Sequence, residues 1–173
     1  RSPGDPPGTP DGASSTEPTS APSTEPLSVA EGPRRRTEPA TLRLNRPPMN
    51  ALSQALLTEL GDAARALGDD ERVKAVVVLG GQKAFAAGAD IVELADQGAA
   101  KRIGKTFRYA FDGVAAIPRP VIAAVNGAAM GAGCDLACMC DIRIAAESAR
   151  FAENFVKLGL IPGDGGAWLL QRV

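Results

Sequence analysis

Two segments rich in glycine and alanine are the strongest candidates for a chemical role in this chain, because their backbone N–H groups could bind a substrate. Residues 85–90 read FAAGAD, and residues 126–135 read NGAAMGAGCD. Each segment follows an apolar, β-branched run and precedes a stretch that predicts a helix, so each offers free backbone N–H groups at a strand-to-helix junction. Two such donors aimed at one point form an oxyanion hole, which stabilises negative charge on a carbonyl oxygen.

Small residues also have a simpler use, because glycine and alanine allow tight turns and close packing. Either segment alone is a weak indication of a site. Their occurrence together, with Asp90 ending the first and Asp135 ending the second, favours a functional role.

No histidine occurs in the chain. This excludes catalysis by Ser-His or Cys-His pairs and by a histidine base. Acid–base chemistry must therefore use carboxylates, lysine, tyrosine or water. The single tyrosine, Tyr109, lies in a stretch whose helical apolar spacing already explains it.

The three cysteines, Cys134, Cys138 and Cys140, are close together near one predicted helix end. Disulfide pairing among them would be geometrically awkward, and the rest of the chain offers no other cysteine. A closed metal site would need unusual ligands in a chain without histidine. We therefore expect no metal, and three small thiols that face a core.

Composition indicates one soluble globular domain with an additional segment, since the net charge of the 173 residues is −1 and 45% of them are hydrophobic. Residues 1–38 are rich in proline, serine, threonine, glycine and charge, which predicts a disordered tail. Residues 39–173 form the expected folded part.

We expect no nucleic-acid partner, because the three arginines at 34–36 are too few for a strong electrostatic contact and have acidic residues nearby. Without a signal peptide or a membrane span, the expected location is cytoplasmic.

The folded part alternates predicted strands and helices. Ser53 is a predicted N-cap for an amphipathic helix that ends at residues 68–70. Apolar runs predict strands at residues 40–44, 73–79, 121–125 and 142–145, and helical spacing predicts further helices at 91–97, 102–116 and from the second small-residue segment to residue 139. The run at 73–79 is typical of a strand buried on both faces. This alternation predicts an α/β domain with mainly parallel sheets.

Several motifs in residues 41–173 recur as a set in one family. They are LNRP at 44–47, NALS at 50–53, FAAGAD at 85–90, PVIAAVNG at 120–127, GAGCDLA at 131–137, CD at 140–141 and LGLIPG at 158–163. With this set the chain resembles the crotonase superfamily, which includes enoyl-CoA hydratases and isomerases.

The resemblance implies a crotonase-like spiral of ββα units, with a coenzyme A thioester lying across it. The oxyanion hole would consist of the backbone N–H groups of Ala89 and Ala132. No separate cofactor is implied, because coenzyme A is part of the substrate. The implied substrate-binding residues are Ala87, Gly88, Asp90, Ile91, Gly131 and Phe155.

The chain departs from the family pattern at several positions. Ala132 replaces a usual glycine, which a backbone donor tolerates. Of the two catalytic glutamates of the hydratases, the first corresponds to Asp135 and the second to Phe155. Val92 stands where many relatives carry a lysine near the coenzyme A phosphates.

A phenylalanine can neither hold water nor deliver a proton, so another acid would have to replace the second glutamate. Glu153 and Asp164 are the candidates, and together with Asp135 they are the expected catalytic residues. Each also has a simpler interpretation, Glu153 as a charge at a helix N-terminus and Asp164 as a turn residue beside Gly165.

The sequence stops at Val173, in the middle of the family pattern. The C-terminal helices that cover the site and join subunits as trimers are therefore expected to be missing, which would leave apolar surface exposed. A trimer-based homo-oligomer is expected if those helices are supplied. Three hypotheses follow: an acyl-CoA hydratase of fatty-acid or related catabolism, a double-bond isomerase that uses Asp135 as its main acid and base, and a truncated relative that at most binds coenzyme A thioesters or partners.

Overall fold

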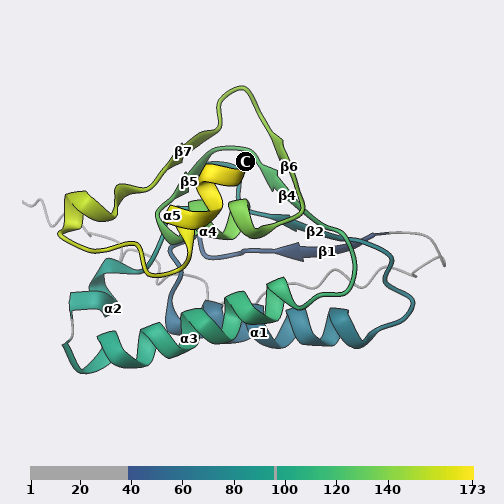
Figure 1. The fold of residues 1–173 in the computed structure, drawn as a ribbon, viewed down its shortest axis with the longest axis horizontal. Coiled ribbons are helices and arrows are strands. Elements are labelled where there is room, and N and C mark those ends of the chain that lie inside the picture. Colours follow the sequence, from purple (N-terminus) through teal and green to yellow (C-terminus); the bar gives the residue numbers. More distant parts are fainter. Residues whose placement is uncertain (1–38, 96) are drawn as a thin grey trace, which may run out of the picture.

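The computed structural model describes residues 39–95 and 97–173, so the expected tail of residues 1–38 lies outside the described part (Figure 1). Its elements follow in chain order as β1 (Ala40–Arg43), α1 (Gln54–Asp69), β2 (Val76–Leu79), β3 (Ala84–Ala86), α2 (Ile91–Ala95), α3 (Gln97–Ala115), β4 (Val121–Val125), β5 (Ala128–Met130), α4 (Ala132–Met139), β6 (Ile142–Ala145), β7 (Arg150–Ala152), the 3₁₀-helix η1 (Asn154–Leu158), α5 (Gly166–Leu169) and the 3₁₀-helix η2 (Leu170–Arg172).

The strands form two sheets, and every strand pair in them is parallel. One sheet has the order β1-β2-β4-β6 and the other has the order β3-β5-β7. After β1 and α1, each turn of the chain adds one strand to each sheet and then a helical segment: β2 and β3 precede α2 and α3, β4 and β5 precede α4, and β6 and β7 precede η1. This is the expected spiral of ββα units.

The main core lies between the four-stranded sheet and the helix pair α1 and α3. These two helices run side by side beneath β1 and β2 in Figure 1. Val76 and Val78 of β2 are fully buried, as are Leu57 and Leu60 of α1. The rings of Phe107 and Phe111 on α3 meet edge to face with centroids 5.6 Å apart. Helix α1 begins after the predicted cap, since the Ser53 side chain accepts a hydrogen bond from the Leu56 amide.

Helix α4 is central to the molecule, and its residues from Ala132 to Cys138 are all buried. Cys134, Cys138 and Cys140 are free thiols in the interior, which confirms that they face a core. Within residues 39–95 and 97–173, the structure contains no helix with both the length and the apolar character that a membrane crossing requires.

Several details differ from the sequence-based prediction. The short strands β3, β5 and β7 were missed, because three residues are too few for an alternating pattern and none of these strands contains a β-branched residue. Helix α3 begins five residues before the expected start, because small and polar residues at its beginning give no apolar periodicity. Strand β2 is buried completely on one face only, since Val77 and Leu79 remain half-buried.

We expect Leu57→Ala to destabilise the fold by about 2–5 kcal/mol, because it leaves a cavity in the core, where this side chain of α1 is fully buried. The matched control is Thr58→Ala, which removes an exposed side chain from the next position of the same helix. The control should change stability by about 0.5 kcal/mol or less. Urea denaturation followed by circular dichroism measures both, and equal losses would contradict the proposed core.

Candidate active site

The first small-residue segment leaves β3 and runs alongside Leu52. The Leu52 amide donates to Gly88 O (2.8 Å), and the Asp90 amide donates to Leu52 O (3.2 Å). The carbonyl of Gly88 and the N–H of Ala89 belong to one trans peptide, so they point in opposite directions. The Ala89 N–H is therefore directed away from Leu52.

The second segment forms the junction between β5 and α4. Gly131 has a φ of 51°, and its carbonyl accepts hydrogen bonds from the amides of Cys134 (2.7 Å) and Asp135 (3.0 Å). That carbonyl therefore points along the axis of α4. The Ala132 N–H, in the same peptide unit, points the opposite way, out of the helix N-terminus, where the first amides have no acceptor within the helix.

The two segments meet in direct backbone contact. A Cβ on Gly88, whose φ is 95°, would lie 2.7 Å from Met130 O and 3.9 Å from Ala132 N. A Cβ on Gly133 would lie 2.2 Å from Ala86 O. Such distances are too short for a side chain, so these two glycines are required for the approach.

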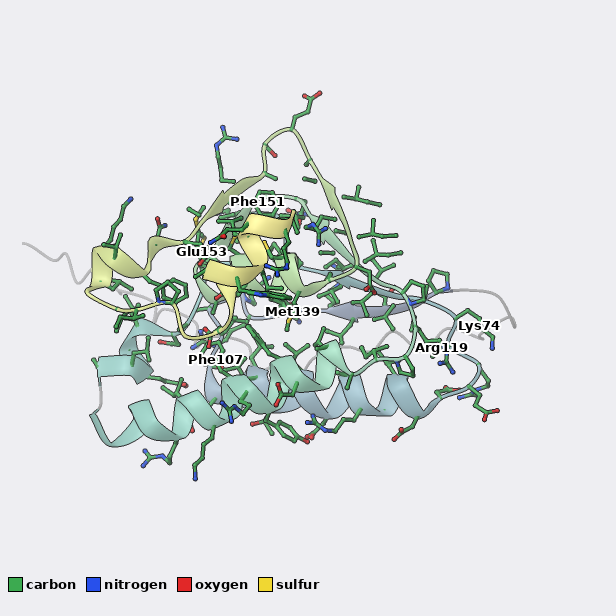
Figure 2. All side chains as sticks on the ribbon, viewed as in Figure 1. Lys74, Phe107, Arg119, Met139, Phe151 and Glu153 are labelled. Carbon is green, nitrogen blue, oxygen red and sulfur yellow. The ribbon has the colours of Figure 1, made fainter. Side chains whose placement is uncertain are left out.

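Two carboxylic acids lie under the start of α5. Asp135, in the first turn of α4, is completely buried, and Glu153 directly precedes η1. A Cβ on Gly166 would lie 1.8 Å from Asp135 Oδ1 and 3.0 Å from Glu153 Cδ, so both carboxyl groups contact the same face of this glycine. Figure 2 shows Glu153 beside the yellow α5 helix.

The oxygens of these two carboxyl groups are buried, and no described residue donates a hydrogen bond to them when both groups are ionised. A proton on Asp135 lies within hydrogen-bond reach of Glu153. Burial, and then the charges of Glu153 and Asp164, raises the pKa of Asp135 from 3.8 to about 8. Asp164 lies half-buried in the loop before α5, and its pKa is raised by burial and by the charge of Glu153. The three predicted catalytic acids thus form one electrostatic cluster.

Phe155 lies against the second donor segment. Its ring carbon Cζ is 3.6 Å from the position that a Cβ on Gly131 would take. The residue is half-buried, so the ring forms an apolar wall next to the residue that precedes Ala132.

The remaining predicted binding residues have different surroundings. The Ala87 amide donates to Met49 O (3.0 Å). Ile91 has an exposed fraction of 63%. Asp90 is buried, and its carboxylate pairs with Arg46 at 2.6 Å, so it does not join the other acids.

Sequence reasoning missed three residues that shape this site, namely Arg46, Asn50 and Gly166. The side-chain amide of Asn50 is buried and donates to the carbonyls of Ala84 (3.2 Å) and Phe85 (3.1 Å), which ties it to β3. Asn50 has a left-handed backbone conformation, with a φ of 51°. Only the structure reveals this conformation, so the sequence alone did not single out Asn50. For Gly166, the sequence did offer a signal: two consecutive glycines, Gly165 and Gly166, follow Asp164 and indicate that the backbone passes close to a side chain there.

Known proteins are similar to this chain in sequence and in fold. The chain is 46% identical over 132 residues to the probable enoyl-CoA hydratase echA8 of Mycobacterium bovis, an alignment that covers 76% of this chain and 51% of the relative. The structure matches that of Pseudomonas aeruginosa DspI with a TM-score of 0.79 and 34% identity, covering 90% of this chain and 59% of the other. It matches an enoyl-CoA hydratase of Bacillus anthracis with a TM-score of 0.77 and 37% identity, covering 86% and 58%.

The chain spans about half the length of the curated relatives it matches. A family model described as enoyl-CoA hydratase/isomerase matches residues 36–173. On the strength of this match, the chain belongs to the enoyl-CoA hydratase/isomerase family.

Proposed function

We propose that this chain forms the thioester site of an acyl-CoA enzyme that adds water to a 2-enoyl-CoA. The amides of Ala89 and Ala132 would hold the thioester oxygen, and the carboxyl groups of Asp135 and Glu153 would exchange the proton. The observation that carries this proposal is the pair of buried carboxyl groups that no described residue supplies with a hydrogen bond when both are ionised. One of them, Asp135, is on the helix whose first amide is the second proposed donor, and the other, Glu153, directly precedes η1.

Burial of an unpaired carboxyl group costs stability, so such groups are rare outside functional sites. Two carboxyl groups against one glycine cannot readily both ionise, because like charges in a buried site repel. One proton shared by the pair gives an acid and a base side by side, as acid–base catalysis requires.

The proposed step keeps the proton count balanced. Glu153 accepts a proton from water as the hydroxyl oxygen bonds to the β-carbon, and the double-bond electrons move toward the thioester carbonyl. The negative charge on the thioester oxygen is stabilised by the two amides. Asp135, which holds its proton up to about pH 8, delivers it to the α-carbon.

Double-bond isomerisation is the second candidate. The contact of the Phe155 ring with Gly131 favours it, since an apolar wall beside the donor segment would limit access of water. Asp135 would then move a proton between the α- and γ-carbons of a 3-enoyl-CoA while the same amides stabilise the enolate.

Mass spectrometry of a short 2-enoyl-CoA and a 3-enoyl-CoA, each incubated with the chain in heavy water, distinguishes the hypotheses. Addition of a whole water to the 2-enoyl-CoA would support hydration. Deuterium uptake with a shifted double bond would support isomerisation instead. No change in either compound would contradict both activities and favour a chain that at most binds the thioester.

We expect Glu153→Gln to lower kcat by about 10²–10⁴-fold with little change in KM, because it removes a proton-accepting group without removing volume. Asp164→Asn is the matched control, and its effect should stay below about tenfold. Steady-state kinetics of hydration measures both variants. A larger loss in Asp164→Asn would transfer the second role to Asp164.

Turnover should be abolished in Asp135→Asn, whereas binding of a saturated acyl-CoA should stay nearly intact. The amide is similar in shape to the protonated acid but cannot release a proton to carbon. Isothermal calorimetry with butyryl-CoA measures the binding, and the heavy-water assay measures turnover. Unchanged turnover would remove Asp135 from the mechanism.

The raised pKa of Asp135 also predicts a pH dependence of stability. The folded chain keeps a proton that the unfolded chain releases above its ordinary pKa of 3.8, so this stabilisation is complete below about pH 4 and is lost as pH rises through about 8. Asp135→Asn stays neutral and should therefore gain stability relative to the parent chain between pH 5 and pH 9.

Thermal unfolding of both proteins across this pH range tests the expectation. Asp112→Asn, which makes the same change of charge on an exposed position of α3, is the control and should show no such trend. A constant difference between Asp135→Asn and the parent chain would mean that Asp135 is ionised throughout.

A further inference from the structure

The first donor segment is connected to the loop after β1 by a buried carboxylate. Asp90 Oδ2 lies 2.6 Å from Arg46 Nη2, and the Asp90 side chain has an exposed fraction of 9% against 43% for Arg46. The other carboxylate oxygen, Oδ1, accepts hydrogen bonds from the amides of Val92 (2.9 Å) and Glu93 (3.4 Å) at the start of α2.

These contacts keep Asp90 ionised. Burial acts to raise the pKa of Asp90, but the two amides and the Arg46 guanidinium outweigh it, so the pKa lies below its ordinary value. A carboxylate so close to a proposed oxyanion hole would oppose the charge that develops there. The guanidinium of Arg46 offsets this opposing charge.

Arg46 is itself fixed at two further points. Its amide donates to Asn50 Oδ1 (2.8 Å), and its Nη1 donates to Ala51 O (3.2 Å). Asn50 in turn is bonded to β3 through its side-chain amide. The guanidinium that contacts Asp90 is thus anchored to the strand from which the donor segment starts.

Hydrogen bonds and the ion pair hold the donor segment on both sides of Ala89. Before Ala89, the Ala87 amide bonds to Met49 O and the Gly88 carbonyl accepts from the Leu52 amide. After it, the Asp90 side chain bonds to Arg46 and to α2. The peptide that bears the Ala89 N–H therefore cannot rotate without breaking one of these contacts.

We infer that the Arg46–Asp90 ion pair holds the first donor segment and thereby aims the Ala89 N–H, so that Arg46 and Asp90 are positioning residues. This inference rests on the proposed function, because it requires that the Ala89 amide bind a thioester oxygen. Asp90 thus has a different role from the substrate contact expected from sequence.

The test variants are Asp90→Asn and Arg46→Gln, each of which removes one partner of the pair. The control variants are Asp70→Asn and Arg72→Gln, which remove one partner of the ion pair between Asp70 Oδ2 and Arg72 Nη2 (2.7 Å) after α1. We expect kcat to fall by about 10–100-fold in the test variants, less than for complete loss of a donor, with KM changed by less than about threefold. The controls should match the parent chain.

Infrared difference spectroscopy of butyryl-CoA labelled with ¹³C at the carbonyl carbon reports directly on the donors. Two amides bound to the thioester oxygen lower its carbonyl stretching frequency. In the test variants the frequency should return part of the way to that of free butyryl-CoA. A test variant that keeps both the lowered frequency and the parent kcat would overturn the inference, as would a raised KM with unchanged kcat and frequency.

Amide hydrogen exchange of the free chain separates this inference from the proposed function. The Val92 amide should exchange at least about tenfold faster in Asp90→Asn, because its carboxylate acceptor is replaced by a weaker neutral one. Unchanged exchange at Val92 would overturn the inference even if the enzyme is active. If bound butyryl-CoA shows no lowered frequency in the parent chain, the proposed oxyanion hole fails, whatever the exchange data show.

Discussion

The structure depends on the close approach of two backbone segments that only glycine permits. Gly88 comes against Met130 O, and Gly133 comes against Ala86 O, so the end of β3 and the first turn of α4 touch without intervening side chains. Any larger residue at either glycine would push the end of β3 away from β5 or from the first turn of α4. This approach brings the peptide units of Ala89 and Ala132, whose N–H groups are the proposed donors, to neighbouring strand-to-helix junctions. It also buries the first turn of α4 together with Asp135.

Burial of Asp135 has an electrostatic consequence for the neighbouring acids. Because α4 is buried from its first residue, its carboxyl group has no water to solvate it, and Glu153 and Asp164 act on it at short range. Helix α5 completes this environment, since Gly166 covers Asp135 and Glu153 together. Burial and the neighbouring carboxylates together thus raise the pKa of Asp135, and the same combination serves catalysis in other buried carboxyl pairs.

Much of this arrangement could be predicted from sequence, and the failures have physical reasons. The β-branched runs indicated β2 and β4, Ser53 indicated the start of α1, and the glycines of both small-residue segments indicated the junctions. Glu153 and Asp164 could be proposed as candidate acids, but their proximity to Asp135 depends on how β7 and α5 fold back over α4. The partnership of Arg46 with Asp90 was not predictable either, because it joins residues 44 positions apart across two turns of the chain. Strands such as β3 and β5 are strands only because of their neighbours, so local propensity could not reveal them.

The spiral arrangement has a consequence for the order in which the site can form. Each new strand adds beside the previous turn, in the sequence β1, β2, β4, β6 along one sheet. The first donor segment belongs to an early turn, the second donor and Asp135 to the next, Glu153 to a third, and Gly166 closes over them last. A ribosome releases the chain from its N-terminus, so the earlier turns of the scaffold can assemble before Asp135 is covered. The raised pKa of Asp135 is therefore coupled to the docking of α5, because Gly166 is part of what buries the carboxyl group.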